Sequence, residues 1–332
     1  MHITGIVKAM SKPRHLTSIA DLSSKELSAL VARGIAHKKN IRSGLYGSSS
    51  PGGRPLEGQT IAMLFSKRST RTRVSTEAAV KYLGGHPMFL GKDDIQLGVN
   101  ESLYDSARVI SSMTSCIVAR VGPHSDIQGL ANASQVPVIN ALCELYHPLQ
   151  AITDIITIQE AFGKTAGLKV AWVGDANNVL HDLALACAKS GINVSAATPS
   201  GYEVESSMLS LIKDTAKENG TWFNTTTDPL EAVKNADIIV TDTWISMGQE
   251  SEKEKKLKEF AGYQVTSEMA SKGGANPDWK FMHCLPRKPE EVSDEVFYSD
   301  RSLVFEEAEN RLYTAIAAIE ALVVHKGDIS KL

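Results

Sequence analysis

Cysteine is scarce in this sequence of 332 residues, and long apolar runs are missing. The four cysteines lie far apart and form no C-x-x-C pair, which argues against a disulfide framework and predicts free thiols in a reducing compartment. No run of about 18 apolar residues is present, which is the length that crosses a membrane as a helix. We therefore expect no membrane role.

A basic excess is also missing. Lys and Arg number 35 against 38 Asp and Glu, which gives a net charge of −3 and a pI near 6.3. Nucleic-acid-binding domains usually show the opposite balance, because their cations displace the counterions of phosphates. We therefore expect no nucleic acid partner, and any local cluster of arginines needs another explanation.

The glycine pattern of dinucleotide-binding proteins, G-x-G-x-x-G, is absent where it would be expected. The run "LKVAWVG" leads directly into the turn "GDANN". A nicotinamide cofactor is therefore not predicted. We expect neither another cofactor nor a metal ion.

What is present is an alternation of short β-branched runs and helical patterns from residue 60 onward, with a helical pattern after Arg73. This alternation predicts an α/β fold with parallel sheets and crossover helices. A chain of this length exceeds one ordinary core, so we expect two doubly wound parallel-sheet domains with a cleft between them. The predicted domains are residues 1–153, completed by a C-terminal helix over 306–332, and residues 154–305.

The stretch "SKRSTRTR" follows the apolar run "TIAMLF", so it lies at the carboxyl end of a predicted strand. Ligands bind at this end in open parallel sheets. Helix N–H groups, the hydroxyls of this stretch and the forked guanidinium of Arg71 together suit a phosphate. The alternative is a capped helix with solvated arginines, which accounts well for Arg73 because it can pair with Glu77 one turn later.

Other polar residues stand at predicted strand ends. "YHPLQ" places His147 and Gln150 at a strand-to-helix junction, with Pro148 suited to the first helical turn. Arg120 ends the run "SCIVAR", where a buried charge needs a partner such as an anion. A lone histidine is more often structural than catalytic.

The second half of the chain offers a different set. In "GDANN", Asp175 and Asn177 suit a turn or a helix cap, whereas Asn178 can instead offer its amide to a ligand carboxylate. Asp242 follows "DIIVT" and suits an ammonium group. Cys284 is either a small buried hydrophobe or a polarisable thiol in the cleft, and the sequence does not separate these readings.

Taken in order, the motifs "STRTR", "HPLQ", "GDANN", "DTWISMG", "HCLPR" and "EAENR" closely resemble the ornithine branch of the transcarbamylase family. The resemblance covers the chain from about residue 15 to its end. It implies a carbamoyl-phosphate domain completed by the C-terminal helix, an ornithine domain, and transfer of the carbamoyl group to the δ-amine of L-ornithine. The products would be L-citrulline and phosphate, as in arginine biosynthesis.

The resemblance also implies roles for individual residues. The catalytic residues would be Thr72, Arg120, His147 and Cys284. Carbamoyl phosphate would contact Ser69, Thr70, Arg71, Thr72, Gln96, Arg120, His147, Gln150, Cys284, Leu285 and Arg311. Ornithine would contact Asn178, Asp242, Ser246 and Met247.

The family assembles as a homotrimer whose active sites lie between subunits, and Gln96 would reach the neighbouring subunit's carbamoyl phosphate. Residues 1–20 contain Lys8, Lys12 and Arg14 and no acid, which resembles the end of a mitochondrial transit segment; the alternative is an ordinary disordered terminus. We therefore expect the mitochondrial matrix, with the cytoplasm as the alternative.

The competing functions are a transcarbamylase for aspartate or putrescine, a phosphate-sensing protein without turnover, and a Rossmann-type oxidoreductase.

Overall fold

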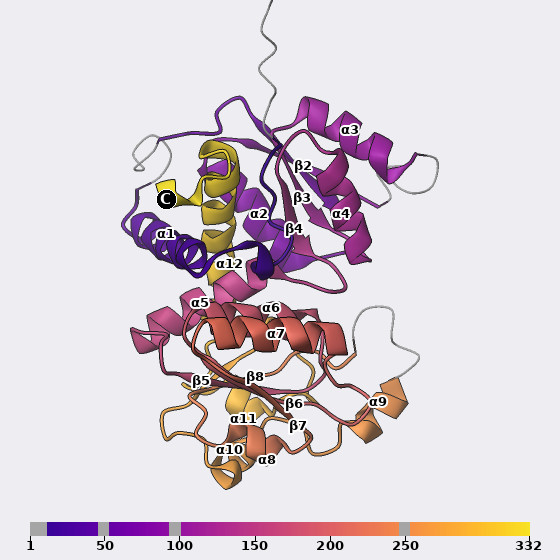
Figure 1. Cartoon of the computed structure of the whole chain (residues 1–332). Coiled ribbons are helices and arrows are strands. Elements are labelled where there is room, and N and C mark those ends of the chain that lie inside the picture. Colours follow the sequence, from indigo (N-terminus) through magenta and orange to yellow (C-terminus); the bar gives the residue numbers. More distant parts are fainter. Residues whose placement is uncertain (1–11, 46–52, 93–100, 246–252) are drawn as a thin grey trace, which may run out of the picture.

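A computed structural model describes residues 12–45, 53–92, 101–245 and 253–332. Two parallel β-sheets, each flanked by helices, lie one above the other (Figure 1). This arrangement confirms the predicted α/β class with two parallel sheets. Among the described residues, no helix is both long enough and apolar enough to span a membrane.

The first sheet has four parallel strands in the order β2-β1-β3-β4. Alternate side chains of β1 point to opposite faces, with Ile61 in the core beside α1 and α2, and Leu64 in the core beside α3 and α4. This double covering explains why the strands are almost wholly apolar. The strands and their helices are α1 (Ser24–Arg42), β1 (Thr60–Phe65), α2 (Thr70–Tyr82), β2 (His86–Gly91), α3 (Leu103–Met113), β3 (Cys116–Arg120), α4 (His124–Ala133) and β4 (Val138–Leu142).

The second sheet has five parallel strands in the order β7-β6-β5-β8-β9. Its elements are β5 (Lys169–Val173), α6 (Asn178–Lys189), β6 (Asn193–Ala197), α7 (Ser206–Glu218), β7 (Phe223–Thr226), α8 (Pro229–Val233), β8 (Ile238–Val240), α9 (Lys253–Glu259), α10 (Ser267–Gly273), β9 (Lys280–Met282) and α11 (Asp294–Phe297). The sequence did not predict β7. This edge strand buries only Phe223 fully, so it lacks an apolar run.

Capping residues and proline determine where two of the helices begin or end. Ser69 caps α2, so the helix begins at Thr70, earlier than the pattern after Arg73 suggested. Helix α5 (Pro148–Phe162) begins with a proline, as expected, and ends at Gly163, whose φ of 69° suits glycine. Because α5 runs through residues 153 and 154, the domain boundary there stays a prediction.

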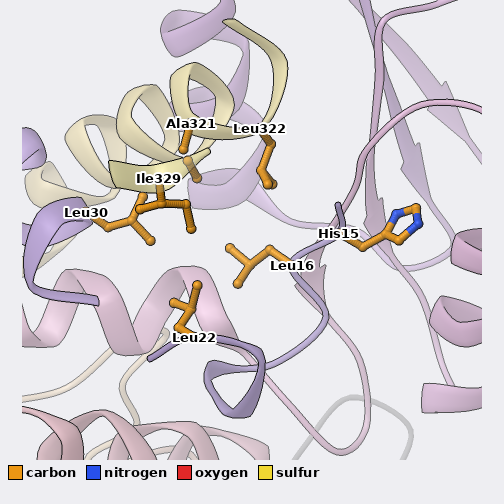
Figure 2. A pocket seen from close by; sticks show the side chains of 8 residues that line it. His15, Leu16, Leu22, Leu30, Ala321, Leu322 and Ile329 are labelled. Carbon is orange, nitrogen blue, oxygen red and sulfur yellow. The ribbon is translucent and has the colours of Figure 1, made fainter. Parts of the chain in front are cut away.

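The C-terminal helix α12 (Val304–Ile319) packs against α2, α1 and α5, and its first turn approaches β9. It continues as one π-helical turn, η4 (Glu320–Val324), followed by η5 (Ile329–Lys331). Figure 2 shows a small apolar pocket where this end meets the N-terminal segment, lined by Leu16, Leu22, Leu30, Leu322 and Ile329 among others. The segment leads through η1 (Ile19–Asp21) into α1, and its Leu16 pairs with Ile139 of β4, so the described part of the N-terminal segment packs on the first unit together with the C-terminal end.

Candidate active site

Each sheet contains one point where the strand order reverses direction. In the first sheet it lies between β1 and β3, and in the second between β5 and β8. Ligands of open α/β sheets bind outside the carboxyl ends of the strands at such points. The motif "SKRSTRTR" follows β1 and Arg120 is the last residue of β3, whereas "GDANN" and Asp242 follow β5 and β8, so the predicted residues occupy both reversal points.

The N-terminus of α2 carries the first group. The Ser69 hydroxyl accepts a hydrogen bond from the Thr72 N–H at 3.3 Å, while Thr70 is exposed and Thr72 is buried. Arg73 pairs with Glu77 at 2.8 Å and stacks on Phe89, which confirms its predicted structural role. The helix start therefore leaves Arg71 as the guanidinium that points to the second unit.

Arg71 crosses between the two units. Its guanidinium donates a hydrogen bond to the carbonyl oxygen of Leu285 at 2.5 Å. Leu285 has a φ of 63°, a left-handed conformation that is uncommon outside glycine and that clusters at functional sites. The peptide bond that follows it, to Pro286, is cis. The contact brings two of the predicted carbamoyl-phosphate residues together.

Arg311 of α12 is the centre of a buried network in the first unit. Its guanidinium donates to Gln150 Oε1 at 2.7 Å, to His147 Nε2 at 3.2 Å and to Thr72 Oγ1 at 3.3 Å. All four side chains are at most 5% exposed. Burial lowers the pKa of Arg311 to about 10, because the charged form loses its hydration. Four of the predicted site residues thus lie in direct contact.

These contacts fix the form of His147. A guanidinium can only donate, so Nε2 of the imidazole accepts and its proton is carried on Nδ1. Burial, and then the positive charges of Arg311 and Arg120, lower the pKa of His147 well below its ordinary value. The ring is therefore neutral near pH 7. Among the described residues, nothing accepts from the buried Nδ1.

Arg120 ends β3, where its register with β4 shifts after Ala119. It is 8% exposed, and its Nε finds no acceptor among the described residues. Burial lowers its pKa to about 10, and the charge of Arg71 acts in the same direction. A buried guanidinium without a carboxylate partner is costly, so this environment favours an incoming anion.

A pair of acids that the sequence did not single out lies behind Gln150. The amide nitrogen of Gln150 donates to Asp154 Oδ1 and to Glu307 Oε1, both at 2.8 Å. Burial raises the pKa of Asp154 to about 7, and burial together with Asp154 raises that of Glu307. Glu307 also accepts from the backbone N–H of His283 at 3.0 Å, so it links α12 to the end of β9.

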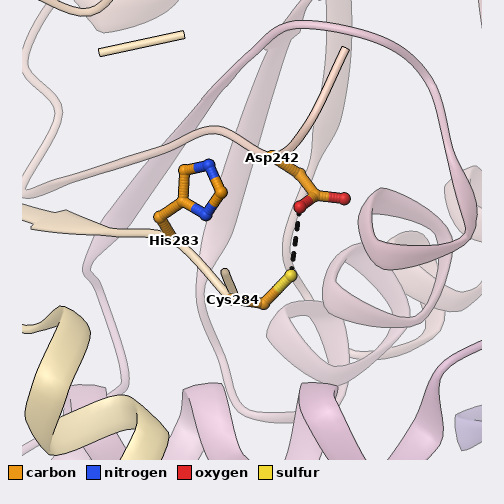
Figure 3. A group of neighbouring side chains, drawn as sticks. All are labelled: Asp242, His283 and Cys284. Carbon is orange, nitrogen blue, oxygen red and sulfur yellow. Dashed lines mark hydrogen bonds between the residues drawn. The ribbon is translucent and has the colours of Figure 1, made fainter. Parts of the chain in front are cut away.

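Asp242 organises the second unit's side of the site. Its carboxylate accepts from the Cys284 thiol at 3.1 Å (Figure 3). It also accepts from the Asn177 amide at 2.7 Å. Burial and then the Asp242 charge raise the pKa of Cys284 well above its ordinary value, so the group is a thiol. Of the two readings of Cys284, the structure favours the polar one. Asn178, in turn, donates to the carbonyl oxygen of Cys143 at 2.6 Å.

His283 anchors the turn that carries Cys284. Its Nδ1 accepts from the Leu285 N–H at 2.9 Å, so its Nε2 carries the proton and donates to Glu291 at 3.1 Å. Both residues are fully buried. This arrangement holds the backbone of Cys284 and Leu285 in place.

Asp242, His283 and Cys284 are also close enough to be metal ligands, with one ligand atom of each within 4.8 Å of the others. However, both ring nitrogens of His283 are already hydrogen-bonded, and the Cys284 thiol donates to Asp242. A metal requires a thiolate and a free imidazole nitrogen. The donor set is therefore arranged as a hydrogen-bonded cluster.

Three of the predicted contacts, at Gln96, Ser246 and Met247, lie outside the described residues and stay predictions. Residues missed by the sequence reasoning are Asp154, Asp182, His283, Glu291 and Glu307. His283 and Glu307 stand inside the quoted motifs "HCLPR" and "EAENR", so the motifs contained a signal for them. Asp182 accepts from the His147 N–H at 2.8 Å, a contact between α6 and the start of α5 that no sequence spacing reveals.

Comparison with known proteins gives two family matches. Residues 14–160 match the model described as "Aspartate/ornithine carbamoyltransferase, carbamoyl-P binding domain". Residues 166–322 match "Aspartate/ornithine carbamoyltransferase, Asp/Orn binding domain". Together the matches cover most of the chain.

Individual relatives are similar over nearly their whole length. A mitochondrial ornithine transcarbamylase of Pachysolen tannophilus is 61% identical over 97% of this chain and 92% of its own. An ornithine carbamoyltransferase of Saccharomyces cerevisiae, whose name gives no compartment, is 51% identical over 97% of each chain. The crystal structure of a mitochondrial ornithine carbamoyltransferase from Coccidioides immitis superposes with a TM-score of 0.88 at 59% identity, covering 96% of this chain and 99% of that one.

Proposed function

The chain belongs to the aspartate/ornithine carbamoyltransferase family as an ornithine carbamoyltransferase, and we propose the following roles for its residues in that reaction. The enzyme transfers the carbamoyl group of carbamoyl phosphate to the δ-amine of L-ornithine, giving L-citrulline and phosphate. The observation that carries the assignment of roles is the meeting of a cationic network on the first unit with a carboxylate and thiol on the second.

On the phosphate side, the start of α2 supplies the binding groups. The first N–H groups of the helix and its positive dipole favour an anion, and Ser69, Thr70 and Thr72 add hydroxyls. Arg71 provides the forked charge, and its bond to the Leu285 carbonyl keeps it at the junction of the two units.

On the carbamoyl side, the developing oxyanion needs donors that are already in position. The neutral His147 offers its unpartnered Nδ1–H, and Arg120 offers Nε. Thr72 supports them with its hydroxyl. Arg311 and Gln150 orient His147 and complete the carbamoyl site, while Cys284 and Leu285 close it from the second unit. Because these donors are buried, they need no reorganisation during the reaction.

On the acceptor side, Asp242 binds an ammonium group of ornithine and Asn178 binds its carboxylate, with Ser246 and Met247 as further contacts. The δ-amine must lose its proton before it attacks the carbonyl carbon. Asp242 accepts a hydrogen bond from the Cys284 thiol at 3.1 Å, and this pair is the first candidate for taking up that proton. The departing phosphate is the second candidate base.

The acceptor distinguishes this enzyme from a transcarbamylase for aspartate or putrescine. Aspartate carries one more carboxylate and needs an extra cation, whereas the described acceptor side offers Asp242. The test is citrulline formation from carbamoyl phosphate and ornithine, with aspartate and putrescine as alternative acceptors. Absence of citrulline with efficient use of another amine would overturn the assignment, and binding of phosphate without any product would favour a sensing role.

We also propose a homotrimer in which Gln96 serves the neighbouring subunit's carbamoyl phosphate, and a location in the mitochondrial matrix. The mitochondrial names of similar fungal enzymes and the basic, acid-free residues 1–20 support the location. Sedimentation analysis tests the trimer, and fractionation of cells that express the protein tests the compartment against the cytoplasm.

A further inference from the structure

One lysine of the second unit is buried, although lysine side chains almost always reach solvent. Lys256 in α9 is 2% exposed. Its ammonium donates to Asp175 Oδ2 at 2.8 Å and to the carbonyl oxygen of Trp244 at 2.9 Å, and it lies 5.2 Å from the centre of the Tyr202 ring. A charge in this position needs a reason beyond solubility.

The partners of Lys256 flank the acceptor side of the site. Asp175 stands in the turn after β5, two residues before Asn177, and Trp244 stands after β8, two residues beyond Asp242. Asn177 and Asp242 are themselves joined at 2.7 Å. The ammonium therefore bridges the turn after β5 and the segment after β8, which carry the proposed ornithine contacts Asn178 and Asp242.

The two segments also pack closely against each other. A Cβ at Gly174 would stand 3.2 Å from Thr241 Oγ1 and 3.4 Å from Trp244 Nε1. The carbonyl oxygen of Asp175 also accepts from the indole N–H of Trp172 at 3.0 Å. We therefore expect a displacement at Asp175 or Trp244 to alter the Asn177–Asp242 contact.

The electrostatics of Asp175 depend on Lys256. Burial raises the pKa of Asp175, while the hydrogen bond and charge of Lys256 oppose that effect. Without the ammonium, the Asp175 carboxylate would lose its ion-pair partner and would either move toward solvent or take up a proton. Either response changes the turn that leads into Asn177 and Asn178.

We propose that Lys256 is a positioning residue for ornithine, which holds the turn after β5 and the end of β8 in the spacing that the substrate requires. The inference rests on the proposed function, since it uses the placement of ornithine between Asn178 and Asp242. Lys256 touches neither substrate in this role. It acts through Asp175 and Trp244.

The test compares Lys256→Met, the double variant Lys256→Met with Asp175→Asn, and the neighbouring control Lys255→Met. The side chain of Lys255 is 72% exposed, and its ammonium lies as far as 4.0 Å from the Glu259 carboxylate. Its replacement therefore removes a charge without disturbing the turn after β5. Titrations of norvaline, which is ornithine without its δ-amine, into the enzyme with carbamoyl phosphate measure acceptor binding without turnover. Carbamoyl phosphate is titrated separately into the free enzyme.

We expect both Lys256 variants to weaken norvaline binding and to raise the ornithine KM roughly tenfold or more, since small displacements of binding groups have effects of this size. Carbamoyl phosphate binding should stay within about twofold of wild type, as should every parameter of Lys255→Met. The double variant removes the unpaired carboxylate, so it should be more thermally stable than Lys256→Met and still bind norvaline weakly.

Wild-type norvaline affinity in the folded double variant would overturn the inference. Equal weakening of both ligands would also overturn it, because that result indicates a general structural role. Failure of the wild-type enzyme to form citrulline would be a separate result, which contradicts the proposed function and not the comparison among variants.

Discussion

Replacing Asp242 by asparagine tests the acceptor side with the smallest change of shape. The carboxylate accepts from two donors, the Cys284 thiol at 3.1 Å and the Asn177 amide at 2.7 Å. Asparagine keeps one acceptor oxygen but introduces an amide nitrogen, which can only donate. One of the two existing donors therefore loses its partner, and the negative charge disappears.

The size of the effect follows from these two losses. A hydrogen bond between charged groups contributes about 1.5–3 kcal/mol, so losing the carboxylate should weaken ornithine binding roughly 10- to 150-fold. The unpartnered donor costs about 1–3 kcal/mol of stability, which lowers Tm by several degrees. Carbamoyl phosphate binding should change by less than about twofold, since its proposed cations lie on α2, β3 and α12.

Calorimetry measures the two ligands separately, with ornithine analogue added to the carbamoyl phosphate complex. The matched control is Asp237→Asn at the other end of β8, where the carboxylate accepts from the Lys169 N–H at 2.8 Å and the Asn276 amide at 2.7 Å. It should lower stability without changing acceptor affinity. Weakened carbamoyl phosphate binding with unchanged acceptor binding in Asp242→Asn would refute the reasoning, as would an equal loss of acceptor affinity in the control.

Three further predictions address the phosphate side, the assembly and the acid stability. Arg71→Ala should raise the KM for carbamoyl phosphate about 10- to 150-fold with little change in Tm, and Arg71→Lys should not restore it, because an ammonium cannot form the forked contact; normal turnover at low carbamoyl phosphate would contradict this. Arg71→Ala and Gln96→Ala subunits, dissociated and reassembled together, should form citrulline faster at low carbamoyl phosphate than either variant alone if sites are shared, and confirmed mixed trimers without any gain would argue against sharing. Burial opposes ionisation of Glu320, but hydrogen bonds from His37 and Arg33 lower the pKa of Glu320 to about 2. The ionised carboxylate therefore stabilises the fold at pH values above its ordinary pKa near 4.5, and this stabilisation is lost as pH falls toward 2. Glu320→Gln should therefore lower Tm at pH 7 and reduce the loss of Tm between pH 5 and 3. Thermal unfolding measured over that range would contradict this if Tm fell equally with pH in the variant and the wild type.

The fold was largely predictable because hydrophobic periodicity records which strands are covered on both faces. Runs such as "TIAMLF" are apolar after their first residue since two helical layers bury them, and this property is visible in sequence. Strand β7 was missed for the opposite reason: it lies at a sheet edge, where Asn224 and Thr225 face solvent. Edge pairing depends on the neighbouring strand and leaves little trace in local composition.

The site was predictable where chemistry and turn position coincide, and unpredictable where contacts join distant segments. Arg71, Arg120 and His147 stand at strand ends or helix starts, so their positions follow from the alternation of elements. Gln150 bonds to Asp154, four positions away, and to Glu307, 157 positions away. In sequence, both acids look like ordinary surface residues of a helix. Only the packing of α12 on α5 makes them a buried pair.

The position of α12 has a consequence for the order of events during synthesis. Domains of a growing chain generally fold in the order in which they emerge. Arg311 and Glu307 are nevertheless made after every other described residue of the network around His147, and the apolar faces of α1, α2 and α5 stay uncovered until α12 arrives. A nascent chain that ends before residue 304 therefore contains every described strand of both sheets but lacks Arg311, which orients His147, so we expect catalytic activity only once translation has passed this helix.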